Sequence, residues 1–281
     1  MTTYIIEKAL NNNVIIAKSE EEEVVLIGCG IGFGKKKNDK IAEEQVEKMF
    51  VLKDPVEQEQ YKQLLHTIDD ETLKTLITVV EMIREKSDSS LNEHIHVALT
   101  DHLVFAIHRL KNGMTIRNPF LIETKTLYPQ EYGIALDVTK LVNKKLEIDL
   151  PEDEVGFIAL HIHSAMGDKE VGELTAYSDL MVQLVQIIEE QFKITIDKES
   201  LDYMRLIRHI RFTIERVVRG EKVVEPKRIK ELLELEYPVY YNLAWKLIKV
   251  MQQKLQKEVY NAEAVFLTLH LQRIRAIHEQ V

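Results

Sequence analysis

The pattern of hydrophobic and polar positions changes once along the chain, near Pro55. Before this residue, short β-branched or apolar runs alternate with turn residues, which predicts strands. The predicted strands are residues 4–6, 14–16, 24–27 and 46–52, and the turns between them are asparagine-rich, glutamate-rich and glycine-rich at 11–13, 20–23 and 28–34. We expect a small antiparallel sheet. Its core is thin, which favours pairing with a second copy of the chain.

From Glu57 onward the pattern is helical. Apolar residues recur at spacings of three and four, as in Ile95, Leu99 and Leu103, and long Glu, Lys and Gln faces separate them. The sequence therefore predicts an all-helical remainder.

The helical part contains an internal repeat. Residues 99–109 realign with residues 206–216, and residues 154–161 realign with residues 263–270. A Tyr-Pro pair between these blocks recurs at nearly the same offset. Three blocks in one order predict a tandem duplication of a module of roughly 110 residues.

The repeat sets the predicted domains. They are residues 1–60, residues 61–171 and residues 172–281. Pro151 and Asn261 mark corresponding helix starts within the two helical modules.

Composition limits the classes of protein. The 281 residues are 45% hydrophobic and 30% charged, as in an ordinary globular protein, and the single cysteine excludes an internal disulfide. No signal peptide and no apolar run of about 18 residues is evident, so we expect a cytoplasmic protein. The net charge of −9 means that any contact with nucleic acid must be local and based on shape.

The ten histidines raise the question of a metal site. His94 with His96, and His161 with His163, form His-x-His pairs. Positions two apart on a helix point to different faces, and neither cysteine ligands nor a His-Glu-x-x-His pattern occurs. The sequence therefore disfavours bound metal.

The duplication selects four of the histidines. His102 matches His209, and His161 matches His270. One explanation is that these are core histidines copied with the module. The other is that they are reactive imidazoles, because a neutral imidazole can accept a phosphoryl group whose charge rearranges a helical interface.

A glycine-rich loop at residues 28–34 precedes Lys35, Lys36 and Lys37. No helix or βαβ unit follows, so a dinucleotide loop is excluded. Phe33 beside three cations suits RNA, where aromatic stacking adds to phosphate contact. A solvated hairpin loop is the alternative.

Together, residues 11–14, residues 28–36 and the two histidine-bearing repeats resemble the BglG/SacY family of transcriptional antiterminators. The resemblance covers essentially the whole chain and is strongest to the branch that controls glucose phosphotransferase genes. It implies a multidomain fold, in which a small antiparallel β-sheet RNA-binding domain, the co-antiterminator domain, precedes two all-α helical-bundle modules. These modules are PTS regulation domains, or PRDs.

The same resemblance implies the function. A homodimer binds a hairpin in a nascent leader mRNA and prevents a terminator from forming, with no enzymatic activity and no cofactor. HPr and a sugar-specific permease of the phosphotransferase system control it by phosphorylation. In the family, phosphorylation of the first PRD generally inactivates, whereas phosphorylation of the second activates many members.

Residue roles carry over by motif match. The implied phosphoacceptors are His102, His161, His209 and His270, and the implied RNA contacts are Lys8, Asn13, Gly28, Gly30 and Phe33. Many relatives have Arg or Lys where this chain has Cys29, so one expected cation is missing from the loop.

Two alternatives belong to other classes. One is a metal-dependent helical hydrolase that uses the histidines. The other is a PRD-containing DNA-binding regulator, although such proteins usually begin with a helix-turn-helix domain and residues 1–52 predict strands. The antitermination hypothesis further predicts that the histidines pair in space, His102 with His161 and His209 with His270, with Arg109 and Arg216 nearby.

Overall fold

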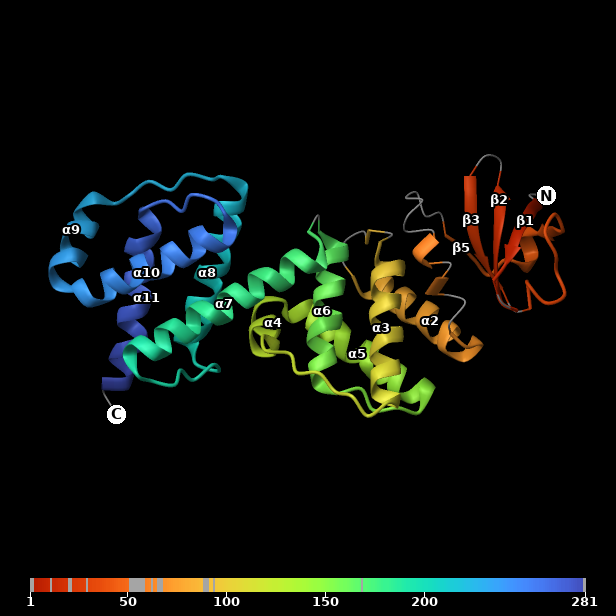
Figure 1. The fold of residues 1–281 in the computed structure, drawn as a ribbon, viewed down its shortest axis with the longest axis horizontal. Helices are drawn as coiled ribbons and strands as arrows, with labels where there is room; N and C mark the ends of the chain where they lie inside the picture. Colours follow the sequence, from red (N-terminus) through yellow and green to blue (C-terminus); the bar gives the residue numbers. More distant parts are fainter. Residues whose placement is uncertain are drawn as a thin grey trace. The chain divides into compact units, whose positions relative to one another are not determined.

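The computed structural model describes residues 3–279 except 11, 20–21, 29, 51–58, 62, 65–67, 88–90, 93 and 168. The chain divides into two compact units (Figure 1). One comprises Met1–Arg117 with Gln130–Lys169, and the other comprises Asn118–Pro129 with Glu170–Val281.

The N-terminal region is an antiparallel sheet, as predicted. Its strand order is β4-β1-β2-β3-β5. The strands are β1 (Thr3–Ala9), β2 (Val14–Ser19), β3 (Glu22–Ile27), β4 (Lys40–Ala42) and β5 (Lys48–Phe50), with a 3-10 turn, η1, at Glu43–Gln45. The sequence pattern missed β4, because three residues are too few to show an alternation. Of the run predicted at 46–52, only Lys48–Phe50 forms a strand among the described residues.

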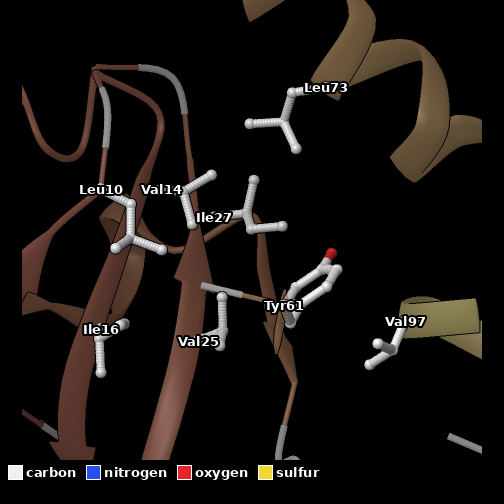
Figure 2. Close-up of a cluster of buried hydrophobic side chains, with 8 residues drawn as sticks. All are labelled: Leu10, Val14, Ile16, Val25, Ile27, Tyr61, Leu73 and Val97. Carbon is white, nitrogen blue, oxygen red and sulfur yellow. The ribbon is translucent and has the colours of Figure 1, made fainter. Parts of the chain in front are cut away.

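Both faces of the sheet are buried. On one face Ile6, Ile15 and Leu26 pack with Ile41. On the other, residues from β2 and β3 pack with three residues from the helical region, Tyr61, Leu73 and Val97. Figure 2 shows Tyr61 lying between the strand residues and Val97. This double burial explains the continuous apolar runs within β2 and β3, whereas β1 alternates between exposed and buried residues.

The described residues from Glu59 onward form helices and connecting segments, which confirms the all-helical prediction. The helices are α2 (Asp70–Lys86), α3 (Ile95–Lys111), α4 (Leu121–Leu127), α5 (Pro129–Leu146), α6 (Glu152–Met166), α7 (Val171–Phe192), α8 (Leu201–Arg219), α9 (Lys227–Glu236), α10 (Pro238–Leu255) and α11 (Ala262–Glu279). None of the helices in the described part is long and apolar enough to cross a membrane.

Local sequence sets the ends of several helices. The carboxylate of Asp69 accepts a hydrogen bond from the Thr72 amide at 2.8 Å, and this cap begins α2. Gly113 and Gly220, which match in the repeat, both have φ of 69° just after α3 and α8. An L side chain is disfavoured in this left-handed conformation, so glycine ends both helices. Pro151 and Asn261 directly precede α6 and α11, as predicted.

The repeat is visible in the packing. In the first module α3 packs on α6, and in the second the corresponding α8 packs on α11. The segment containing α4, however, belongs to the second compact unit. There Glu123 accepts hydrogen bonds from Lys198 Nζ at 2.9 Å and from the Tyr203 hydroxyl. The boundaries at residues 61–171 and 172–281 stay a prediction.

Candidate phosphorylation and RNA-binding sites

The two repeated histidines of the first module lie side by side. His102 comes from α3 and His161 from α6, and their ring centroids are 4.8 Å apart with 37° between the rings. Both side chains are mostly buried, since they lie in the interface between the two helices. This geometry confirms the predicted pairing.

The second module reproduces the arrangement. The ring centroids of His209 and His270 are also 4.8 Å apart, with 33° between the rings. The separation of the two ring centroids is thus the same in both modules.

A buried glutamate lies beside each first histidine, and sequence reasoning missed it. Glu154, in the first turn of α6, is 3% exposed, and its Oε2 lies 3.0 Å from Nε2 of His102. Its Oε1 accepts a hydrogen bond from Arg109 at 2.8 Å. The sequence contained one signal for this contact, because Glu154 is the first residue of the repeated block that ends at His161.

The corresponding glutamate of the second module is held differently. Glu263 is 1% exposed and accepts hydrogen bonds from both Nε and a terminal nitrogen of Arg216, at 3.0 and 2.8 Å. It also accepts a hydrogen bond from the Thr213 hydroxyl at 2.8 Å. Nε2 of His209 stays 3.6 Å away. The two arginines that we expected near the histidines therefore bind carboxylates in this structure.

Burial determines the protonation of these histidines. It lowers the pKa of His161 to about 3, and the neighbouring His102 and His94 lower it further. Burial, followed by His270 and Arg216, likewise lowers the pKa of His209 to about 3. These imidazoles are neutral at pH 7, so each retains a lone pair that can attack phosphorus.

The pKa values of His270 and Glu154 are also lowered. Burial lowers the pKa of His270, and Arg273 adds to the effect. Burial raises the pKa of Glu154, but the contacts with His102 and Arg109 outweigh it, and the pKa lies below its usual value. Glu154 is therefore ionised and acts only as a hydrogen-bond acceptor.

Among the described residues, no group of three or more His, Cys, Asp or Glu side chains could hold a metal ion.

The glycine-rich loop is built around Asn13. Its side chain is buried, and its Oδ1 accepts a hydrogen bond from the Gly30 amide at 2.9 Å. Its backbone carbonyl accepts another from the Gly28 amide at 3.0 Å. A Cβ on Gly28 would lie 2.2 Å from the Gln45 carbonyl oxygen, so only glycine fits there. These three positions shape the loop.

The remaining predicted RNA-contact residues lie on the surface. Phe33 is 74% exposed, which is unusual for a large apolar ring, and Lys8 is exposed on β1. Nearby, Lys37 and Lys18 contact Glu7 at 2.9 and 3.1 Å and lower the pKa of that carboxyl. The predicted effect of Cys29 concerns a position outside the described residues.

Comparison with known families agrees with this architecture. Residues 4–59 match the CAT RNA binding domain, and residues 77–165 and 182–274 match the PRD domain. The chain belongs to the family of transcriptional antiterminators that join a CAT RNA-binding domain to two PRDs. It is a regulatory protein and not an enzyme.

Similar proteins point to one branch of this family. The PtsGHI operon antiterminator of Bacillus subtilis is 52% identical over 273 residues, which cover 97% of each chain. The GlcA/glcB genes antiterminator of Staphylococcus carnosus is 43% identical and covers 100% of this chain and 99% of its own length. A crystal structure of GlcT CAT-PRDI is 52% identical, with a TM-score of 0.53, and covers 58% of this chain and 98% of that one. These relatives match the glucose-operon branch.

Proposed function

We propose that this protein is a cytoplasmic homodimer that binds a leader mRNA hairpin upstream of glucose-uptake genes and keeps the terminator from forming. HPr and a glucose-specific permease control it by phosphorylating His102, His161, His209 and His270. The observation that carries this proposal is the repeated imidazole pair, 4.8 Å between centroids in each PRD. Two modules that keep the same pair of buried, mutually facing histidines support a shared chemical role.

The environment of the pairs supports a switch. A phosphoryl group adds a charge near −2 at pH 7. In the first PRD this charge would arise beside ionised Glu154, in an interface between helices where unpaired charge costs several kcal/mol. Arg109 could then leave the carboxylate for the phosphate, or the packing of α3 on α6 must change. Either response alters the first PRD.

The loop of the CAT domain supports RNA binding at a small surface. Phe33 offers an exposed stacking face, and Lys8 adds a cation on β1. Asn13, Gly28 and Gly30 act by fixing the loop that presents Phe33. Such a small, shaped surface is compatible with the net charge of −9, because recognition of the RNA then depends on local shape and not on a general positive field.

The test combines phosphorylation with RNA binding. The full chain is incubated with enzyme I, HPr, phosphoenolpyruvate and the permease domains, and phosphohistidine is mapped under conditions that preserve it. We expect phosphate on the four repeated histidines. His108→Gln removes an exposed, unrepeated histidine and serves as the control. Phosphate confined to histidines outside the two pairs would contradict the proposal.

A further inference from the structure

The two PRDs differ at one residue beside the buried glutamate. Four residues after the first histidine, the second PRD has Thr213, whereas the first has Ala106. The Thr213 hydroxyl donates to Glu263 at 2.8 Å and lies 3.5 Å from Nε2 of His209. Ala106 is buried and carries no polar group that could take this place.

The carboxylates respond to this difference. In the first PRD, each oxygen of Glu154 has one neighbour, Arg109 or His102. Oε2 and the histidine Nε2 approach off the ideal hydrogen-bond angle, and within the described residues neither has another polar partner. In the second PRD, Arg216 and Thr213 both donate hydrogen bonds to Glu263, and Nε2 of His209 lies 3.6 Å from Oε2 of this glutamate.

The arginines differ in the same sense. Arg216 binds Glu263 through Nε and a terminal nitrogen, as a fork. Arg109 binds Glu154 through a terminal nitrogen alone, and its buried Nε has no partner among the described residues. In the second PRD, where the Thr213 hydroxyl is present, Glu263 binds mainly Arg216. In the first PRD, which lacks this hydroxyl, Glu154 contacts both Arg109 and His102.

We propose that the residue at this position, Ala106 or Thr213, determines the hydrogen-bond partner of Nε2, and through it the reactivity, of the first histidine in each PRD. An ionised carboxylate accepts a proton but cannot donate one, so Glu154 fixes the Nε2 proton of His102. The free lone pair is then on Nδ1, and the carboxylate makes that nitrogen more nucleophilic. In the second PRD the Thr213 hydroxyl gives its proton to Glu263, so it can only accept from Nε2 of His209. A neutral hydroxyl then replaces the carboxylate as the partner of this ring, and the activation is weaker. The reactivity part of the proposal rests on the proposed function.

The transfer step balances without a further reactant. The Nδ1 lone pair of His102 attacks the phosphorus of a phosphohistidine or phosphocysteine on the donor protein. The new N–P bond forms as the donor's bond to phosphorus breaks, and the electron pair of that bond returns to the donor. The Nε2 proton of His102 stays shared with Glu154, which stabilises the charge that develops on the ring.

The experiment exchanges the two residues in the full chain. Thr213→Val keeps the shape of the side chain and removes its hydroxyl, while Ala106→Ser adds one. The Nε2–H signals are read from nitrogen–proton NMR spectra with labelled histidine, assigned with His102→Gln and His209→Gln. We expect Thr213→Val to move the Nε2–H signal of His209 towards that of His102, because the carboxylate becomes its partner, and Ala106→Ser to move the His102 signal the opposite way.

A matched control is available on α11. Thr268 is fully buried and donates to the Ala264 carbonyl at 2.6 Å, so Thr268→Val removes a hydroxyl without altering the bonds of Glu263. The His209 signals should not move in this variant. If Thr213→Val leaves the Nε2–H signal of His209 unchanged, or if Thr268→Val moves it equally, the proposal is overturned.

Initial rates of phosphorylation test the second part. With phosphorylated HPr as the donor, His209 should accept phosphate about tenfold faster in Thr213→Val, the scale typical of a hydrogen-bonded partner that orients a histidine. A moved Nε2–H signal with an unchanged rate would overturn the reactivity part. A moved signal with no phosphate on His209 in any variant would instead overturn the proposed function and leave the assignment of the hydrogen-bond partner supported.

Discussion

Acidification from pH 7 to pH 5 should destabilise the second PRD through His209. Burial, followed by His270 and Arg216, lowers the pKa of this histidine from 6.5 to about 3. Between pH 6.5 and pH 3, His209 is therefore protonated in the unfolded chain but neutral in the folded chain. Stability is highest above this window and falls as the pH drops through it.

The magnitude follows from the width of the window. Each pH unit below 6.5 costs roughly 1.4 kcal/mol, so His209 alone lowers the free energy of unfolding by up to about 2 kcal/mol at pH 5. The Glu263 carboxylate, 3.6 Å away, favours the protonated ring and opposes this effect. It is already bound by Arg216 and Thr213, so we expect burial to prevail.

The single tryptophan makes the measurement specific. Trp245 lies in α10 of the second PRD, so its fluorescence follows unfolding of that module in urea. The free energy of unfolding is measured at pH 7 and pH 5 for the wild type and for His209→Gln. The variant should lose about 2 kcal/mol less than the wild type between the two pH values, whatever its stability at pH 7.

His108→Gln, which removes an exposed histidine of the first PRD, controls for the loss of any imidazole. Its pH dependence should match that of the wild type. If wild type and His209→Gln lose the same free energy on acidification, burial of a neutral His209 is refuted as the cause.

Other predictions concern the loop and the switch. Phe33→Ala should weaken RNA binding by about 1–3 kcal/mol in a gel-shift titration without lowering the melting temperature, because its ring is exposed. Asn13→Ala should weaken binding by a similar amount and also destabilise the CAT domain, because the loop loses its Oδ1 acceptor; equal melting curves would contradict this reading. Gly28→Ala should lower the melting temperature, since its Cβ would collide with a backbone oxygen. His102→Asp should partly mimic phosphate and lower antitermination in a reporter strain, and a fully active, sugar-regulated variant would refute that mechanism.

Patterns along the chain were enough to predict the sheet, the helices and the repeat. Apolar spacing separated the sheet from the helices, and the offset between residues 99–109 and 206–216 disclosed the duplication. Both are local or repeated patterns, which one chain can display without a structure. The same repeat singled out His102 and its counterpart His209, because copied positions stand out from the other histidines.

The surroundings of those histidines, in contrast, depend on how the helices pack. Glu154 is 52 residues from His102 in the chain, and no spacing rule links a glutamate at a helix start to a histidine on another helix. The difference between Ala106 and Thr213 is a single mismatch inside an aligned block, and it acquires meaning only where the hydroxyl meets a buried carboxylate. Likewise, the short strand β4 and the burial of Asn13 depend on partners distant in sequence, because pairing and burial are set by packing and not by local preference.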